Sequence, residues 1–472
     1  MEMILLTLIK THGGDIKGYT KKKINYFLGI PYADKPINEH RFKHSKCLKT
    51  WDKTIEATSF KSIPPQPYNK LETFFSSHAQ LFNQSEDCLY LNIWCQNNQY
   101  NNKPVIIYFY GGGFVNGHGS QELYTPEHIV ARHDVIVITF NYRLGALGFL
   151  DWSYFNSDYN KNNGLSDQIN ALKWVHTFIK YFGGDSNNIT LMGQSAGSMS
   201  IMALMQRPEL DKYYHQVMLL SGTLRLDSHL LGQKKAAHFA YLKDAYCPKK
   251  SITHLTTLDI LSLMAYDEAS RGKSKGLELI YAPIQESNMS RPLSQFTKPV
   301  VIGTTKEEGN IYIRNESRKL SSERFVEVMK LNDIHLHISQ VQTGKDQALM
   351  VTTHYFETPA ISFLNQLENN RHCWKLRFDW CLSNVSPFQS AYHILDLVFW
   401  FGKLEILKAH GVNSLEHERH LSKHMIDDLI YFATYHTMPW SSYSPQTPYC
   451  YIYINKKKRN DEFKMNSVPL PT

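Results

Sequence analysis

One serine of this chain stands between small residues in a pattern that suits a nucleophile. Residues 193–197 read GQSAG, with Ser195 at the centre, and match G-x-S-x-G. A short strand-like run, 188–192, leads into the motif, and a helix-prone run, 198–205, follows it. A sharp turn from strand to helix exposes the serine Oγ, and free N–H groups at the start of the helix stabilise a developing oxyanion. The pattern predicts attack of Ser195 on a carbonyl carbon.

A triple glycine, residues 111–113, follows the apolar run 104–110 (PVIIYFY). Consecutive glycines expose consecutive backbone N–H groups in a conformation that other residues adopt only at a cost. Such a segment is either half of an oxyanion hole or an ordinary tight turn. Because the serine motif lies roughly 80 residues downstream, we favour the oxyanion hole.

A serine nucleophile also needs a base and an acid that orients the base. The chain has 22 histidines, so composition alone selects none of them. In proteins built around such a turn the order along the chain is serine, acid, histidine, which places both partners after Ser195.

The segments that must hold these residues alternate between strand-like and helix-like. Runs 104–110, 135–140 and 217–220 are continuous and apolar, as strands buried on both faces are. Residues 165–181 have the apolar spacing of a helix, and 449–454 read as a late strand. This order predicts an α/β fold with a large, mostly parallel central sheet and helices on both faces.

The chain shows no internal repeat and no linker, so we expect a single domain over residues 1–472. Helical, more polar segments at about 224–295 and 310–380 interrupt the order of the sheet. We expect these two segments to be cap-like insertions over the site.

Composition excludes several classes of protein. Hydrophobic residues make up 42%, which excludes wholesale disorder. The net charge of +8 is mild for 472 residues, and the basic runs at 21–23 and 456–459 are short, so we expect no nucleic-acid partner. No apolar stretch is long enough to span a membrane. The expected partner is a small-molecule ester, and the expected state is a monomer.

The start of the chain and its cysteines favour a cytoplasmic protein. An acid, Glu2, stands where an export signal carries a basic residue, and the apolar run 4–9 is short. Seven cysteines form an odd number without metal-ligand spacing, so we expect free and mostly buried thiols.

Further motifs occur in a fixed order along the chain. They are FLGIPYA (27–33), RF (41–42), SEDCLYLN (85–92), YGGGF (110–114), NYRLG (141–145), GLSDQ (164–168), FGGD (182–185) and GQSAG (193–197). In these motifs the chain resembles the type-B carboxylesterases, the cholinesterase-like branch of the α/β-hydrolases, and looks most like the bacterial para-nitrobenzyl esterases. The resemblance extends from about residue 24 to about residue 455. It implies the α/β-hydrolase fold.

The resemblance also implies the remaining site residues. The segment GTTKEEG (303–309) is similar to a family loop whose second acid orients the histidine, which implies Glu308. The segment AYHILDL (391–397) is similar to the family's G-A-x-H-x-x-E/D-L, which implies His393 as the base. The oxyanion donors implied are the N–H groups of Gly112, Gly113 and Ala196.

Three more residues match family positions outside the reacting groups. Ser221 matches a serine that supports the acid and the histidine from behind. Arg41 and Glu86 resemble a family salt bridge, to which we assign a structural role.

The chain departs from the family at three positions. Gln194 replaces the usual glutamate before the nucleophile, and Tyr110 replaces the common histidine before the triple glycine. Cys88 matches half of a family disulfide, but the other half falls in 63–66 (IPPQ), without cysteine, so we expect no disulfide there. Gln194 either adjoins His393 or is buried away from it with purely structural hydrogen bonds.

These features predict a serine carboxylesterase that works through an acyl-enzyme. Ser195 attacks the ester carbonyl, His393 takes and returns the proton, and Glu308 holds the tautomer of His393. The alternative is a catalytically silent binding or adhesion protein on the same fold. Such relatives usually lack the serine or the histidine, and this chain has both.

A metallohydrolase is the third class considered. His417, His420 and His424 could share one helix face, but their spacing differs from H-E-x-x-H. We interpret them as a solvated helix surface and expect neither a metal nor a cofactor.

Overall fold

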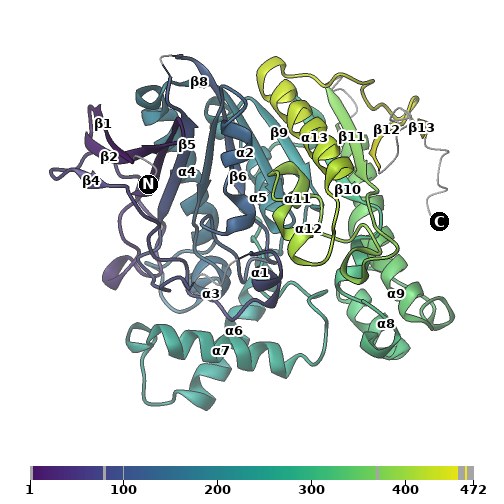
Figure 1. The fold of residues 1–472 in the computed structure, drawn as a ribbon. Helices are drawn as coiled ribbons and strands as arrows, with labels where there is room; N and C mark the ends of the chain where they lie inside the picture. The colour runs from purple at the N-terminus through teal and green to yellow at the C-terminus, as the bar shows by residue number, and fades with distance from the viewer. Residues whose placement is uncertain (1–3, 78–80, 99, 368–371, 455–462, 465–472) are drawn as a thin grey trace.

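One large sheet runs through the whole molecule (Figure 1). The structure, a computed structural model, describes residues 4–77, 81–98, 100–367, 372–454 and 463–464. Within these residues thirteen strands form a sheet in the order β1-β2-β3-β5-β7-β6-β8-β9-β10-β11-β12-β13, with β4 beside β2. The strands are β1 (Leu5–Thr11), β2 (Gly14–Lys21), β3 (Ile24–Pro31), β4 (Ile55–Glu56), β5 (Tyr90–Gln96), β6 (Lys103–Phe109), β7 (Ile136–Phe140), β8 (Gly184–Gln194), β9 (Gln216–Leu220), β10 (Val300–Thr305), β11 (Cys373–Phe378), β12 (Tyr449–Tyr453) and β13 (Phe463–Lys464).

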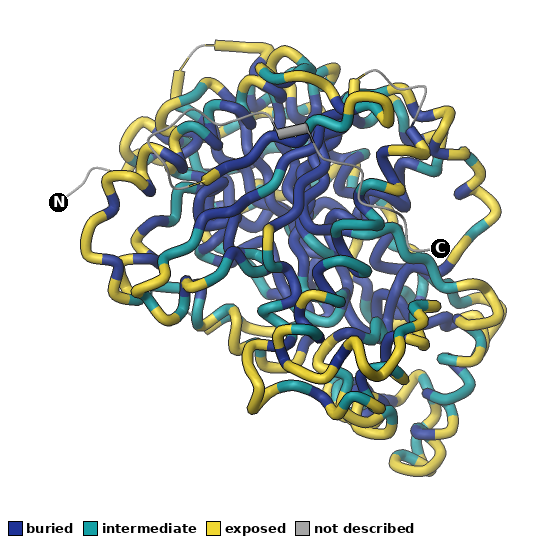
Figure 2. The backbone as a smooth tube through the Cα atoms, turned by 90° about the vertical axis from the view of Figure 1, so that its right-hand side faces the viewer, coloured by how far each residue is buried: buried dark blue, intermediate teal, exposed yellow. Residues whose placement is uncertain are grey.

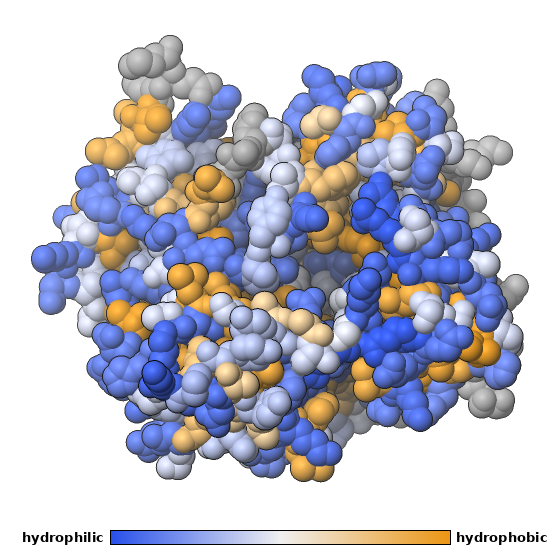
Figure 3. Space-filling model, turned by 90° about the horizontal axis from the view of Figure 1, so that it is seen from below, coloured by the Kyte–Doolittle hydropathy of each residue, from blue (hydrophilic) through white to orange (hydrophobic). Residues whose placement is uncertain are grey.

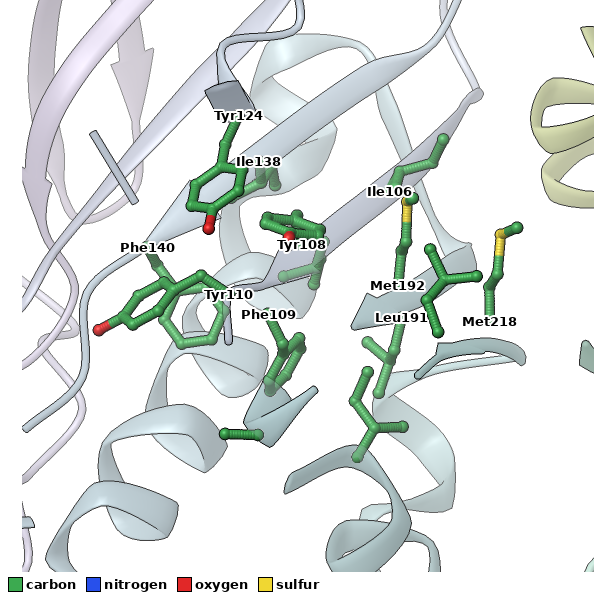
Figure 4. Packing of buried hydrophobic residues seen from close by; sticks show 14 of the residues in the cluster. Ile106, Tyr108, Phe109, Tyr110, Tyr124, Ile138, Phe140, Leu191, Met192 and Met218 are labelled. Carbon is green, nitrogen blue, oxygen red and sulfur yellow. The ribbon is translucent and has the colours of Figure 1, made fainter. Parts of the chain in front are cut away.

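Neighbouring strands from β7 to β12 in this order are all parallel, whereas β1, β2, β3 and β5 form an antiparallel edge. The central strands are buried on both faces (Figure 2), and residues 105–109 of β6 are at most 1% exposed. Their side chains pack with those of β7, β8 and β9 in one hydrophobic core (Figure 4). A continuous apolar sequence is what such a position requires, because both faces must be covered. The predicted mostly parallel sheet is confirmed.

Helices cover both faces of this sheet (Figure 1). α4 and α5 contact β8 on one side, while α2 contacts β5 and α13 contacts β6 and β8 on the other. The helices are α1 (Lys70–Phe74), α2 (Glu127–Val130), α3 (Gly145–Phe149), α4 (Asn163–Phe178), α5 (Ala196–Met205), α6 (His229–Tyr246), α7 (Thr257–Ser270), α8 (Ser322–Lys330), α9 (Gly344–Val351), α10 (Thr358–Gln366), α11 (Leu397–Trp400), α12 (Glu405–Ala409) and α13 (Glu416–Tyr435).

The register brings the carboxyl ends of four parallel strands to one level. Phe109 of β6 pairs with Gly193 of β8, and Gln194 of β8 pairs with Leu220 of β9. Leu220 pairs in turn with Gly303 of β10. The residues that follow these strands therefore meet at one edge of the sheet, which is where α/β sheets bind ligands.

Two groups of helices interrupt the sheet and lie at the same end of the molecule (Figure 1). Between β9 and β10 the chain forms α6 and α7, and between β10 and β11 it forms α8, α9, the π-helical segment Thr352–Glu357 and α10. Residues of the second group form a separate hydrophobic cluster, which Leu277 of the first group joins; its other members are Ile313, Leu320, Phe325, Val328, Met329, Val341, Ala348, Val351, Tyr355 and Phe356. The single domain with two cap-like insertions stays a prediction.

The predicted helical segment 310–380 overlaps a strand that sequence analysis did not identify. β11 reads CWKLRF, so charged residues alternate with apolar ones and the run resembles no buried strand. Lys375 is nevertheless 1% exposed, and its Nζ donates a hydrogen bond to Sγ of Cys450 on β12 at 3.7 Å. The strand is stabilised by its two parallel neighbours, which the local sequence does not reveal.

The cysteines give a prediction about redox chemistry. All seven lie in the described part of the chain as free thiols, and burial raises the pKa of Cys47 to about 11 and that of Cys373 to about 12. We expect a thiol reagent to count seven thiols in denatured, non-reduced protein, and the buried ones to react slowly in the folded protein because the thiolate is the reactive form. An intramolecular cystine found by mass spectrometry would contradict this.

Candidate active site

Ser195 lies in a strained turn between β8 and α5. Its φ of 53° and ψ of −123° are a backbone conformation that residues with a Cβ rarely adopt. The turn is tight because its glycines allow close approach: a Cβ on Gly197 would lie 2.0 Å from the carbonyl oxygen of Phe109. A Cβ on Gly193 would lie 2.7 Å from the carbonyl carbon of Gly197. The small residues of GQSAG are therefore required by packing.

The triple glycine packs directly against this turn. A Cβ on Gly111 would lie 2.5 Å from Oε1 of Gln194 and 2.9 Å from Cβ of Ser195. Gly112 and Gly113 have φ of 113° and 60°, which favour glycine. Among the described residues, the N–H groups of Gly112, Gly113 and Ala196 have no hydrogen-bond acceptor. Three backbone donors are therefore free near Ser195, which is the arrangement expected of an oxyanion hole.

Glu308 and His393 form a buried pair. Nδ1–H of His393 donates to Oε2 of Glu308 at 2.7 Å, and Glu308 is fully buried. The other oxygen, Oε1, accepts from Oγ of Ser221 and from the backbone N–H of Thr305, both at 2.7 Å. A buried carboxylate needs such donors to remain charged. Ser221, predicted to support the pair, thus contacts Glu308 itself.

The neighbouring acid, Glu307, has a different contact. Its Oε2 accepts from the backbone N–H of Ala391 at 2.8 Å, and its own N–H donates to the carbonyl oxygen of Ala391 at 2.9 Å. Glu307 therefore holds the segment that carries His393 without touching the imidazole. Of the two adjacent acids, only Glu308 reaches His393.

Gln194 occupies the far side of the imidazole. It is 1% exposed, and its Nε2 lies 3.0 Å from Nε2 of His393. Since Nδ1 carries the proton toward Glu308, Nε2 of the neutral ring is an acceptor and the amide N–H is the donor. Within the described part of the chain, no hydrogen bond joins Oγ of Ser195 to His393. Of the two alternatives for Gln194, the structure has the one in which it adjoins His393.

Three further side chains near His393 escaped sequence analysis. The ring of Phe356 lies 5.0 Å from the imidazole and that of Tyr312 lies 5.9 Å away, measured between centroids. Both residues belong to the second helical insertion, whose sequence carries no motif. Asp396 is buried, and burial, reinforced by the charge of Glu308, raises its pKa to about 7. Asp396 lies within the motif that identified His393, but nothing in that motif signalled a shifted carboxyl group.

Ser195, Gln194, His393 and the triple glycine line one cavity of about 900 Å³. Figure 3 views the end of the molecule that carries α6 to α9 and shows a hollow near its middle. Much of the lining is apolar, and includes Leu71, Phe75, Met199, Leu261 and Phe356. A cavity of this size, with polar groups gathered at one place, accommodates a small organic molecule.

The other sequence candidates lie apart from this cavity. Arg41 makes two hydrogen bonds of 2.5 Å to Glu86 and a third to the carbonyl oxygen of Leu255, just before α7. Neither Arg41 nor Glu86 lines the cavity that holds Ser195. Through the hydrogen bond to Leu255, the pair connects the N-terminal segment to the first insertion.

The three histidines of α13 do not form a metal site. His417 and His420 are exposed, whereas Nε2 of His424 lies 2.8 Å from the hydroxyl of Tyr451. Among the described residues there is no group of three or more histidine, cysteine, aspartate or glutamate side chains placed to hold a metal ion. Nor does any described helix have the length and apolar composition to cross a membrane.

Known proteins resemble this chain over most of its length. The model of the carboxylesterase family matches residues 6–468. Para-nitrobenzyl esterase of Bacillus subtilis (strain 168) is 32% identical over 416 residues, which cover 85% of this chain and 84% of that protein.

Solved structures extend the similarity to the fold. A structure described as PNB esterase has a TM-score of 0.85 at 29% identity, and a thermophilic PNB esterase has a TM-score of 0.86 at 28% identity. Each alignment covers 95% of this chain and 96% of the other. The predicted α/β-hydrolase fold and the predicted class of carboxylic ester hydrolase are thereby confirmed at the level of the family. This chain belongs to the carboxylesterase family and shares the α/β-hydrolase fold of the para-nitrobenzyl esterases.

Proposed function

We propose that this protein is a serine carboxylesterase in which Ser195, His393 and Glu308 form the catalytic triad. The observation that carries the proposal is the hydrogen-bonded chain from Ser221 and Thr305 through Glu308 to His393, which opens into the cavity that Ser195 also lines. Family membership supports the same activity. Small carboxylic esters are the proposed substrates.

The reaction would proceed in two halves. Ser195 Oγ attacks the ester carbonyl while His393 Nε2 accepts its proton, and the imidazolium then protonates the departing alcohol. The carbonyl oxygen becomes an oxyanion that accepts hydrogen bonds from Gly112, Gly113 and Ala196; one such donor contributes roughly 3 kcal/mol in other hydrolases. Water then attacks the acyl-enzyme with His393 again acting as the base.

Gln194 has to move for this reaction to begin. Its amide N–H donates to the lone pair of His393 Nε2 that must receive the serine proton. Catalytic hydrogen bonds are often long or misaligned before substrate binds. We propose that binding of the ester turns Ser195 Oγ toward Nε2 in place of the Gln194 amide.

A catalytically silent binding protein is the alternative. The free backbone donors beside a strained serine favour the enzyme, because a binding protein gains nothing from that strain. The cytoplasmic location and the monomeric state stay predictions, and the acyl-chain preference is open to measurement with p-nitrophenyl esters of increasing length.

The first test replaces the nucleophile. We expect Ser195→Ala to lower kcat for p-nitrophenyl acetate by several powers of ten, as loss of a triad member does elsewhere. Ser198→Ala is the matched control, since Ser198 is a buried serine on α5, three residues further along, whose Oγ has no hydrogen-bond partner among the described residues. In the unmodified protein, an organophosphate should label the peptide that contains Ser195. Labelling of another serine would refute the assignment.

The second test separates the two adjacent acids. Glu308→Gln should lower kcat by about 10²- to 10⁴-fold, because the imidazole loses the carboxylate that fixes its tautomer. Glu307→Gln should keep most of the activity, since a glutamine oxygen can still accept from Ala391 N–H. The measurement is the steady-state kcat of both variants. A larger loss in Glu307→Gln than in Glu308→Gln would mean that Glu307 is the acid of the triad.

The third test concerns the charge beside His393. A carboxylate cannot donate to neutral Nε2 and instead favours the imidazolium, so Gln194→Glu should raise the acid limb of kcat/KM by about one unit or more. The measurement is the pH profile for one neutral ester at constant ionic strength. Asp396 is the same in both proteins, so the difference between the profiles reports residue 194. If the acid limb stays at the same pH, the residue at position 194 has no effect on the protonation of His393.

A further inference from the structure

Arg225 brings a fixed positive charge to the wall of the cavity that holds Ser195 and His393. It lies four residues beyond Ser221, in the segment that follows β9, and is half-buried. The sequence motifs do not include it, and the mechanism above does not use it.

Two neighbours hold the guanidinium in place. Its Nη1 donates to Oδ1 of Asn332 at 2.7 Å, and its Cζ lies 4.1 Å from the ring centroid of Tyr355. Asn332 is itself oriented, because its Nδ2 donates to the hydroxyl of Tyr355 at 2.7 Å and to the carbonyl oxygen of Val328 at 3.1 Å. The stacked, hydrogen-bonded arginine is thus ordered before any ligand binds, and such preorganisation favours binding.

Among the described residues, no carboxylate lies within 4.0 Å of the Arg225 guanidinium. Most acids that line the cavity do have a hydrogen-bond donor of their own. Oε1 of Glu278 accepts from Nη1 of Arg271 at 2.8 Å, whereas its Oε2 is buried without a hydrogen-bond partner among the described residues. Glu122 accepts from Ser76 Oγ at 2.8 Å and from Ser77 N–H at 2.9 Å. Glu72 lies 2.8 Å from His118 Nε2, and Glu268 is exposed. The hydrogen bond to Asn332 uses one of the five N–H groups of the guanidinium, which leaves donors for a ligand.

Aromatic rings connect Arg225 to the reacting groups. Tyr355, on which Arg225 stacks, is followed by Phe356, whose ring lies 5.0 Å from His393. Burial raises the pKa of Tyr312, the negative charge of Glu308 adds to this rise, and the positive charge of Arg225 opposes it. The charges of Arg225 and Glu308 therefore both influence the Tyr312 hydroxyl. The centroid of the Tyr312 ring lies 5.9 Å from that of His393.

We propose that Arg225 is an anion subsite, and that the esters hydrolysed by this enzyme carry a carboxylate which Arg225 binds while Ser195 attacks the ester carbonyl. A planar guanidinium binds a carboxylate through two parallel N–H···O bonds, and an apolar wall strengthens them. The inference rests on the proposed esterase activity and specifies its substrate class. The carboxylate belongs either to the acyl half or to the alcohol half, and both are tested.

The experiment compares charged and neutral esters of matched shape. For the acyl half the pair is the p-nitrophenyl monoester of adipic acid and p-nitrophenyl hexanoate. For the alcohol half it is 4-carboxyphenyl acetate and 4-carbamoylphenyl acetate. In one of these pairs we expect the unmodified enzyme to have a kcat/KM about tenfold or more higher for the charged ester, and added salt to reduce the ratio.

Variants assign that preference to one residue. Arg225→Met should lower the ratio of charged to neutral kcat/KM by about tenfold to a hundredfold, the range for a lost charge-assisted hydrogen bond. Arg225→Lys keeps the positive charge but loses the planar guanidinium, so its ratio should lie between those of the unmodified enzyme and Arg225→Met. It replaces Arg225→Met in the test if that variant does not fold. Lys275→Met is the control: Lys275 also lines the cavity but is exposed, and its loss should leave the ratio unchanged.

The outcomes separate this inference from the proposed function. Hydrolysis of the neutral esters without preference for the charged member of either pair would overturn the anion subsite and leave the esterase standing. An equal loss of preference in the Arg225 and Lys275 variants would also overturn it, because the effect would then be general electrostatics. If Ser195 hydrolyses none of the four esters, both proposals fail together.

Discussion

The buried carboxylate of Glu308 is the constraint on which the site depends. An ionised group with no exposed surface is costly unless donors surround it, and here three donors come from three places in the chain: Ser221, Thr305 and His393. Ser221 and Thr305 meet because β9 and β10 are parallel neighbours whose carboxyl ends are level, and His393 is brought to them by the hydrogen bonds between Glu307 and Ala391. The same hydrogen bond that stabilises the charge fixes which nitrogen of His393 carries the proton.

The other side of the imidazole is governed by packing around the serine turn. Gly111 lies so close to Gln194 and Ser195 that a Cβ would overlap them, and the Gln194 side chain lies between Gly111 and His393. An amide at this position can donate to the neutral ring and, turned round, can accept from the imidazolium. A carboxylate can only accept. Glutamine and glutamate have nearly the same shape, so under the proposed mechanism they would differ here in the hydrogen bonds that they can offer His393.

The sheet and the helical insertions contribute different things. The sheet carries Ser195 and Glu308 just beyond the carboxyl ends of β8 and β10, and the fold as a whole, over 95% of the chain, is similar to that of PNB esterase. The insertion between β10 and β11 supplies Tyr312, Tyr355 and Phe356, which have a hydrophobic cluster of their own and face the cavity. The same insertion also packs on the sheet, because Ala360, Phe363 and Leu364 of α10 belong to the main hydrophobic core. Under the proposal for Arg225, substrate preference would depend on the segment that follows β9 and on the insertion that provides Asn332 and Tyr355.

The sequence by itself determined the parts that are local. The motif around Ser195 and the triple glycine are short segments whose glycines meet a packing requirement within a few residues, and the continuous apolar runs of β6 and β7 reveal buried strands directly. The resemblance to a family added Glu308 and His393, which composition could not select among 22 histidines. Tertiary structure decided what depends on distant partners. β11 exists as a strand because β10 and β12 flank it, and Gln194 reaches Nε2 of His393, 199 residues away along the chain, only because the sheet brings them together. Arg225, Asn332 and Tyr355 carry no motif, because a preorganised charge arises from the relative placement of three segments and not from the spacing of residues in any one of them.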